Sequence, residues 1–282
     1  MTWFYAIGFL AGLSGILAII LAIANAKLKV YEDPRIEKVS EMLPGANCGA
    51  CGLPGCRAFA EEVVKGDIQP SGCPVGGVDT ANYIANYLGI DPGSMVKKVA
   101  RLLCAGGTDV AVQAGIYEGY ASCRAAAAVS GGPKACLYGC LGLADCEIAC
   151  TFDAIHMGPT DLPIVDAEKC TACGDCVEIC PKNLFELMPI NRHLIVQCKS
   201  LLEGDQALEA CQVACTGCGL CAADAPEGLI TMRNNLPVIN AGKLNEETEI
   251  ATLRCPTKAI IWVEEQQFPE QVRAVAVQTN DI

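Results

Sequence analysis

The chain has 282 residues, with 20 lysine or arginine and 32 aspartate or glutamate residues, so its formal net charge is −12. This acidic balance argues against nucleic acid as a partner, because too little positive charge is present to displace counterions from phosphates. Hydrophobic residues make up 52% of the chain and charged residues 18%, which argues against an intrinsically disordered protein. The chain holds 20 cysteines but only 2 histidines and 5% aromatic residues. We infer that groups held by cysteine fill part of the interior.

The first segment has the length and composition of a membrane-spanning helix. Thr2 to Ala26 contains no charged residue and can cross the ~30 Å hydrocarbon layer of a bilayer. A cleaved signal peptide is the alternative, and Ala24-Asn25-Ala26 resembles a cleavage site, but no lysine or arginine precedes the apolar run. We therefore expect residues 1–26 to be a retained anchor.

The charges after this segment predict the orientation of the chain. The first positive charges, Lys27 and Lys29, follow the apolar run, so the positive-inside rule predicts a single-pass protein of the cytoplasmic (inner) membrane with its soluble part in the cytoplasm. Structural disulfides are rare in that compartment. The cysteines are therefore predicted to bind metal.

Residues 30–90 form the first soluble block, a small metal-binding domain. We expect helices over Pro34–Met42, Arg57–Lys65 and Thr80–Leu88. The block contains four cysteines in the pattern C-x2-C-x4-C-x16-C, namely Cys48, Cys51, Cys56 and Cys73. This spacing alone fits zinc or a [4Fe-4S] cluster, and the neighbouring ferredoxin motifs favour the cluster.

The remainder of the chain repeats itself. An offset of 75 carries five cysteines and a proline onto residues of the same type: Cys123, Cys136, Cys140, Cys146, Cys180 and Pro181 onto Cys198, Cys211, Cys215, Cys221, Cys255 and Pro256. We expect a connecting segment over 91–132, ferredoxin-like modules over 133–190 and 191–265 that arose by duplication, and a tail over 266–282. The predicted fold class is α+β.

The first module carries the strongest motif, a C-x2-C-x2-C-x3-C-P run from Cys170 to Pro181. In this arrangement three cysteines bind one [4Fe-4S] cluster and the fourth binds its neighbour. Position 143, where a standard upstream motif has a cysteine, is Leu143, and Cys136 is the available substitute. The rule then predicts two ligand sets: Cys136, Cys140, Cys146 and Cys180 for one cluster, and Cys150, Cys170, Cys173 and Cys176 for the other.

The second module retains the ligands of one cluster and has lost those of the other. The retained ligands are Cys215, Cys218, Cys221 and Cys255, while the lost positions are occupied by Ala225, Asn245, Thr248 and Ala251. This correlated loss favours cubane clusters over disulfides or zinc. Four cysteines remain: Cys104, Cys123, Cys198 and Cys211. They are either buried small hydrophobes or the ligands of a fifth cluster, so the chain is predicted to hold at least four clusters.

Two segments resemble a known family. The anchor followed by Pro44 to Cys56 (PGANCGACGLPGC) resembles the B component of the Rnf complex, and Gly131 to Gly142 with the ferredoxin motifs resembles its longer, multi-cluster form. The resemblance implies an iron–sulfur subunit of an ion-translocating ferredoxin:NAD+ oxidoreductase, which accepts electrons from soluble ferredoxin and passes them to membrane subunits. The lost cluster of the second module departs from the longer form.

These observations predict an electron-transfer subunit without an active site of its own, since no P-loop and no G-x-G-x-x-G after a strand is present. Electrons are expected to enter near Cys215–Cys255 and to leave near Cys48–Cys73. Ferredoxin is expected to dock on a basic patch of Lys182, Arg192 and Lys199. The alternatives are a membrane-tethered polyferredoxin of another dehydrogenase and a zinc-stabilised scaffold without redox function.

Overall fold

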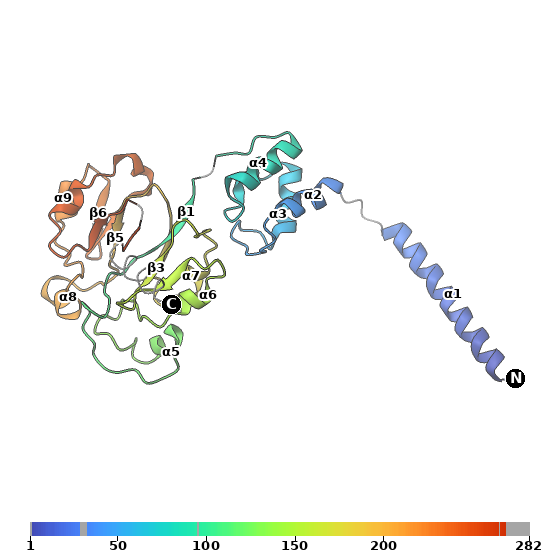
Figure 1. Cartoon of the computed structure of the whole chain (residues 1–282), viewed down its shortest axis with the longest axis horizontal. Helices are drawn as coiled ribbons and strands as arrows, with labels where there is room; N and C mark the ends of the chain where they lie inside the picture. Colours follow the sequence, from blue (N-terminus) through green and yellow to red (C-terminus); the bar gives the residue numbers. More distant parts are fainter. Residues whose placement is uncertain (1, 29–32, 95, 265, 269–282) are drawn as a thin grey trace, which may run out of the picture.

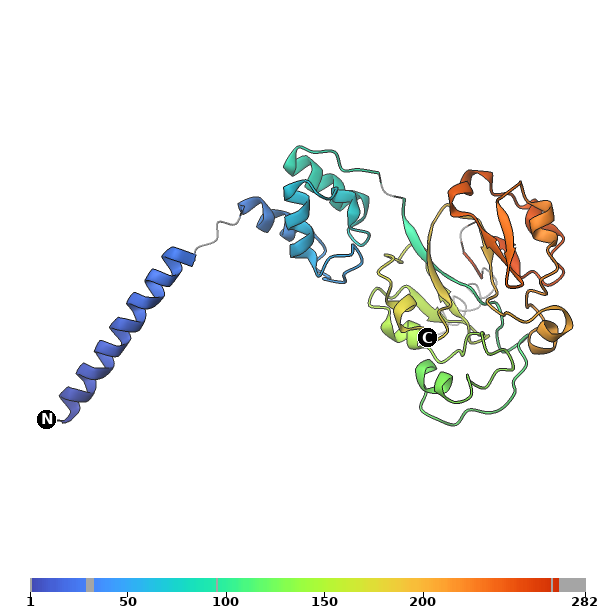
Figure 2. The same ribbon diagram turned by 180° about the vertical axis from the view of Figure 1, so that it is seen from behind.

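The computed structural model describes residues 2–28, 33–94, 96–264 and 266–268. Its first element is helix α1 (Thr2–Leu28), which Figures 1 and 2 show apart from all other labelled elements. Within the described part of the chain, α1 is the one helix that by length and composition could cross a membrane. Its apolar section, Trp3–Asn25, is not buried against other elements. Lys29, used above to predict orientation, lies outside the described residues.

A small helical block follows α1. It consists of α2 (Pro34–Met42), α3 (Cys56–Lys65), the short 3-10 helix η1 (Pro70–Gly72) and α4 (Gly77–Leu88). The Asp33 carboxylate accepts a hydrogen bond of 2.9 Å from the Arg35 amide and caps α2. Phe59 and Val63 on α3 pack against Val39 and Ile84 in one core. The three helices predicted for this block therefore form, although α4 begins three residues earlier than expected.

The next unit contains two antiparallel strand pairs and two short helices. Strand β1 (Lys98–Leu102) pairs with β4 (Phe185–Pro189), and β2 (Ile155–Met157) pairs with β3 (Pro163–Val165). Helices α6 (Asp145–Ala149) and α7 (Asp175–Ile179) complete the unit. Its core mixes aliphatic side chains with cysteines.

A second unit has the same order of strands and short helices. Strand β5 (Leu194–Val196) pairs with β8 (Ile260–Trp262), and β6 (Ile230–Arg233) pairs with β7 (Leu236–Ile239). Helices α9 (Leu220–Asp224) and α10 (Ile250–Leu253) begin 75 residues after α6 and α7, since 145 + 75 = 220 and 175 + 75 = 250. The remaining elements are α5 (Cys123–Ala128), α8 (Gly204–Ala210) and the 3-10 segment η2 (Ala241–Glu246).

The segment 91–132, which the sequence predicts to be a connector, contributes an element to the first unit. Strand β1 lies within it and pairs with β4 along its whole length. The start of the predicted tail is also part of the fold, because the side chain of Gln267 is buried and accepts a hydrogen bond of 3.0 Å from the Leu102 amide. Short sequence patterns did not reveal these contacts because both join residues far apart in the chain.

Because α1 packs against no other described element, its removal should leave the remaining fold intact. We expect a chain that lacks residues 1–26 to be soluble and brown, and to stay in the supernatant when membranes are sedimented. Continued tight association of this truncated chain with membranes would contradict the assignment of α1 as the anchor.

Candidate metal centres

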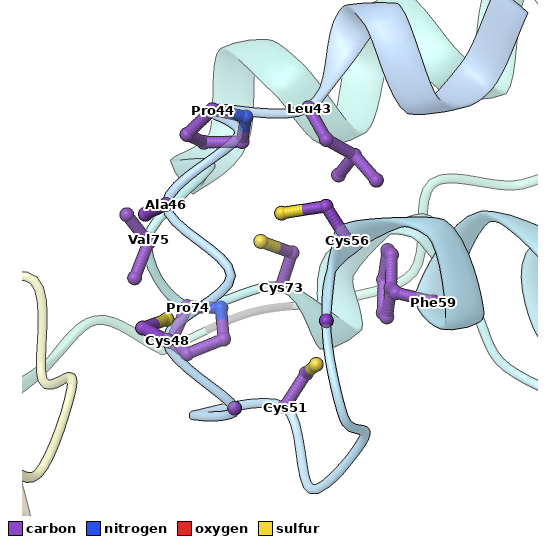
Figure 3. Close-up of a pocket in the computed structure, with 12 residues that line it drawn as sticks. Leu43, Pro44, Ala46, Cys48, Cys51, Cys56, Phe59, Cys73, Pro74 and Val75 are labelled. Atoms are coloured by element: carbon purple, nitrogen blue, oxygen red, sulfur yellow. The ribbon is translucent and has the colours of Figure 1, made fainter. Parts of the chain in front are cut away.

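Four cysteines of the helical block surround one hollow and form quartet I: Cys48, Cys51, Cys56 and Cys73. The hollow measures about 330 Å³ and is otherwise lined by apolar side chains that include Leu43, Phe59 and Val75. Figure 3 shows the cysteines approaching this space from the loop, from the start of α3 and from the segment after η1. This geometry suits a bound group with four sulfur ligands.

Backbone hydrogen bonds fix the loop of quartet I. The side-chain oxygen of Asn47 accepts a hydrogen bond of 2.9 Å from the Cys56 amide, and the Gly76 amide donates to the Cys73 sulfur at 3.4 Å. Asn47 itself has a left-handed backbone with φ 48°, a conformation that asparagine tolerates better than most residues. Asn47 therefore closes the loop across the cysteines.

Quartet II consists of Cys150, Cys170, Cys173 and Cys176, which line a hollow of about 320 Å³. Cys176 lies on α7, and Cys150 follows α6 directly. Backbone amides again point at sulfur, from Ala154 to Cys150 at 3.4 Å and from Ala100 to Cys170 at 3.5 Å. These are the four ligands that the sequence predicts for the second cluster of the first module.

In the second unit, Cys215, Cys218, Cys221 and Cys255 line a hollow of about 340 Å³, and we call them quartet V. The positions where the sequence predicts that a second cluster was lost are occupied by packed side chains. Ala251 is buried in the core of this unit, Ala225 packs against that core, and Arg254 forms an ion pair with Asp224 between α10 and α9. The structure thus has four cysteines at the retained site and apolar packing at two of the lost positions.

A further hollow, of about 360 Å³, lies where the two units meet, and its four cysteines form quartet IV: Cys104, Cys136, Cys198 and Cys211. Three of the four are buried, with 7% of Cys104, 8% of Cys136 and 5% of Cys211 exposed. The Lys134 side chain also lines this hollow.

The last four of the 20 cysteines, Cys123, Cys140, Cys146 and Cys180, form quartet III. Burial raises the pKa of the Cys146 thiol, and the neighbouring thiols of Cys140, Cys123 and Cys180 raise it further. These four groups are therefore close enough to interact electrostatically. The Leu184 amide donates to the Cys180 sulfur at 3.5 Å.

The arrangement differs from the sequence prediction at two residues. Cys136 was predicted to join Cys140, Cys146 and Cys180, but it lines quartet IV, and Cys123 occupies the predicted place of Cys136. The possible fifth set predicted from Cys104, Cys123, Cys198 and Cys211 likewise contains Cys136 in place of Cys123.

Local contacts explain this exchange. Burial raises the pKa of the Cys123 thiol, and hydrogen bonds from the backbone of Asp145 and Leu143 oppose the rise. The Ser122 hydroxyl also binds the Asp145 carboxylate at 2.9 Å. Cys123 thus lies beside position 143, the site of the missing cysteine, and supplies a thiol there from another part of the chain.

Cys136 is held elsewhere by backbone pairing. The Ala135 amide donates to the Val112 carbonyl at 2.9 Å, and the Val112 amide donates to the Ala210 carbonyl at 3.0 Å. These bonds place Cys136 next to Cys211, which follows Ala210. No pattern of short spacing predicts such pairing, since the three segments are far apart in the sequence.

The thiols of these groups share one environment. Burial raises the pKa of Cys140 and Cys176 to about 12 and that of Cys198 and Cys221 to about 11. Buried thiols near other thiols need a positive centre to ionise, and a metal cluster supplies it. A tetrahedral zinc site would instead bring sulfurs within about 2.3 Å of one point. In the described part of the chain, no group of three or more His, Cys, Asp or Glu side chains converges closely enough to hold a single ion.

Adjacent quartets are neighbours in space. Cys51 of quartet I and Cys170 of quartet II line one larger cavity between the helical block and the first unit. The Cys176 thiol of quartet II raises the pKa of Cys146 in quartet III, after burial and nearer thiols. The Cys140 amide of quartet III donates to the Cys104 sulfur of quartet IV at 3.4 Å. These neighbours give the spatial order I, II, III and IV.

Known iron–sulfur proteins match both the loop of quartet I and the ferredoxin motif. A family model described as "Putative Fe-S cluster" matches residues 43–75, and one described as "4Fe-4S binding domain" matches residues 163–186. The B component of the Na+-translocating ferredoxin:NAD+ oxidoreductase complex of Acetobacterium woodii is 44% identical over 254 residues, which cover 90% of this chain and 76% of the relative. The chain belongs to the family of Rnf B components.

Two other relatives of this family align over similar lengths. The B component of the ion-translocating oxidoreductase complex of Methanosarcina acetivorans is 35% identical, over 90% of this chain and 96% of the relative. The B component of the proton-translocating ferredoxin:NAD+ oxidoreductase complex of Clostridium ljungdahlii is 38% identical, over 87% of each chain. The predicted resemblance to the Rnf B component is confirmed, and the matched iron–sulfur models contain all of quartet I and Cys170, Cys173, Cys176 and Cys180.

The hydrogen bond from Cys56 to Asn47 yields a test of quartet I. Asn47→Ala removes the acceptor and strains a left-handed backbone, and we expect it to destabilise the loop by about 1–2 kcal/mol. The variant should lose the quartet I cluster faster when a chelator is added, as measured by released iron. Asn47→Asp keeps an oxygen acceptor and tolerates the same backbone, so it should retain the cluster. Equal loss in both variants would contradict the role assigned to this hydrogen bond.

Proposed function

We propose that this chain is the membrane-anchored iron–sulfur subunit that accepts electrons from reduced ferredoxin and relays them to the membrane subunits of an ion-translocating ferredoxin:NAD+ oxidoreductase. Quartets I, II, III and V would each hold a [4Fe-4S] cluster. The anchor would span the cytoplasmic membrane once, with the soluble part of the chain on the cytoplasmic side. The names of the aligned relatives support the oxidoreductase and the multi-subunit complex.

One observation supports the relay most directly. Among the 20 cysteines, only Cys48 and Cys218 are exposed, and they belong to quartets I and V. Quartet I lies in the block that follows the anchor, and quartet V lies in the unit farthest along the chain. A relay needs access for a partner at each end and shielding from solvent between, which is the distribution of exposure seen here.

The protein's own residues have three tasks in this function. Thiolates hold the clusters, which supply one-electron chemistry at negative potentials when bound. Backbone N–H groups donate to the sulfurs, and such bonds tune the potential. Aliphatic side chains around each hollow limit the access of water. No bond is made or broken in the chain, so no acid, base or nucleophile is required of it.

The alternatives fit less well. A zinc-stabilised scaffold would not explain the match of residues 163–186 to a family model described as "4Fe-4S binding domain". A polyferredoxin of another dehydrogenase would not explain identities of 35–44% with Rnf B components over about 90% of this chain. We also propose that the two ferredoxin-like units arose by duplication, and their shared order of helices and strand pairs supports this.

The basic docking patch needs revision. Arg192 is 7% exposed and forms an ion pair of 3.5 Å with the buried Glu247 carboxylate, so it is not available to a partner. Lys182 and Lys199 remain, and their amines donate to the carbonyls of Leu137 and Asn183. We propose these two lysines as the basic contribution to ferredoxin docking.

Ligand variants at the two ends of the relay should have opposite effects. Cys51→Ala should remove about four irons, one cubane, and stop transfer to the membrane subunits, while reduced ferredoxin still reduces the distal clusters. Cys218→Ala, the matched variant at the other end, should prevent loading by ferredoxin but leave the quartet I cluster reducible by dithionite. Low-temperature EPR of the reduced protein distinguishes the clusters. If ferredoxin failed to reduce the distal clusters in Cys51→Ala but still reduced them in Cys218→Ala, the assigned entry and exit of electrons would be reversed.

Electrostatic docking predicts a dependence on salt. Lys182→Gln with Lys199→Gln should slow the reduction by ferredoxin several-fold at low ionic strength and have little effect at high ionic strength. Lys65→Gln, on α3 of the helical block, is the control and should not change the rate. A rate that is independent of salt in the unmodified chain would favour docking on the exposed apolar residues Ile250 and Leu253 of α10.

A further inference from the structure

We propose that quartet IV holds a fifth [4Fe-4S] cluster, with Cys104, Cys136, Cys198 and Cys211 as its ligands, and that this cluster connects the two ferredoxin-like units. The ligand set differs from the one that the sequence suggests for a fifth cluster, because it contains Cys136 rather than Cys123.

The hollow of quartet IV matches the others. It measures about 360 Å³, against about 330, 320 and 340 Å³ for quartets I, II and V, and like them it is lined by four cysteines. Quartet IV thus has the same number of cysteines around a space of the same extent as the quartets that lie within single units. The space therefore fits a bound group of the same kind.

Backbone groups are arranged toward the sulfurs. The Cys140 amide donates to the Cys104 sulfur at 3.4 Å, and the Ser200 amide donates to the Cys198 sulfur at 3.4 Å. The same pattern occurs at quartets I and II, where Gly76, Ala154 and Ala100 donate. Amide donors around sulfur stabilise thiolates more than neutral thiols.

Lys134 provides an independent indication of negative charge. Its side chain lines the hollow, and the residue is only 4% exposed. The amine donates to the Gly106 carbonyl at 2.6 Å, and within the described residues it forms no ion pair with a carboxylate. A buried ammonium without a counter-charge is costly. An iron–sulfur cluster held by four thiolates is anionic and would supply that charge.

The ligands come from both halves of the fold. Cys104 follows β1, and Cys198 follows β5, and the two segments are joined by a hydrogen bond of 3.1 Å from the Ala105 amide to the Gln197 carbonyl. The backbone of Cys211 pairs with that of Ala111 in an isolated antiparallel β-bridge. Quartet IV therefore lies at the junction of the two units, with Cys140 of quartet III on one side.

Contact with quartet V completes the series. The Cys215 backbone is hydrogen-bonded to the Cys198 thiol. Cys198 of quartet IV is therefore next to Cys215 of quartet V. If the proposed function holds, one electron at a time from ferredoxin passes from quartet V through quartet IV to quartet III, and each donor is oxidised as its acceptor is reduced. This relay role rests on the proposed function, but the ligand set does not.

Iron loss in paired variants tests the ligand set. Cys136→Ala, Cys198→Ala and Cys123→Ala should each remove about four irons from the full chain, purified without oxygen. Because Cys136 and Cys198 share a cluster, their double variant should also lose about four. The double variant of Cys123 and Cys198 should lose about eight, since these residues belong to different clusters. EPR signals of quartets I and II are the internal control for folding.

The opposite pattern would overturn the proposal. Loss of about four irons in the Cys123–Cys198 double variant and about eight in the Cys136–Cys198 variant would restore the sequence-based partition. No iron loss in Cys198→Ala would make quartet IV a set of packed thiols. If a variant does not accumulate, native mass spectrometry of the unmodified chain decides, with about 20 irons expected for five clusters and about 16 contradicting the fifth.

Lys134→Met tests the site without touching a ligand. Removing the buried positive charge should lower the reduction potential of one cluster, measured by EPR-monitored titration, and leave the others unchanged. Lys65→Gln is the control on the surface of the helical block. An unchanged set of potentials in Lys134→Met would contradict an anionic cluster in this hollow. Neither iron content nor potential depends on ferredoxin, so failure of the proposed function would not affect these tests.

Discussion

The gathering of cysteines from distant parts of the chain into groups of four is the constraint on which this structure depends. Helices α6, α7 and α9 have five residues each, and strands β2, β3, β5 and β8 have three. Elements this short are not stable alone and need tertiary contacts. Each of these helices carries a cysteine of a quartet. Clusters bound to the quartets would therefore stabilise the fold in the way that a large aliphatic core does elsewhere.

The cysteines differ in solvent exposure according to their quartet. Those in the three inner quartets are buried or half-buried, while Cys48 and Cys218 at the two ends are exposed. Exposure raises the risk of oxidation and makes contact with a partner possible. A series with two accessible ends and a shielded middle suits electron transfer between two partners better than storage of metal.

The sequence predicted the local motifs well and the long-range pairing poorly. Quartets I, II and V contain short spacings such as C-x2-C. The helix of quartet I was expected within one residue of its observed start, whereas no positions for α7 and α9 were predicted from the sequence. The sequence assigned Cys123 and Cys136 to the wrong groups. Their neighbours depend on contacts between distant segments, such as the hydrogen bond from the Ala135 amide to the Val112 carbonyl. Leu143, at a position where a standard motif has a cysteine, indicated that one cysteine of quartet III comes from another part of the chain. It did not indicate which cysteine. Strand β1 was missed for the same reason.

The central claim is that the cysteines form a continuous series of five quartets that hold clusters. Locating the irons by anomalous X-ray scattering from crystals of the full chain, grown without oxygen, tests it most directly. We expect five iron centres, one of them at the junction of the two units and bound by Cys104, Cys136, Cys198 and Cys211. Four centres with no iron at that junction, or iron that joins Cys136 to Cys146, would contradict it.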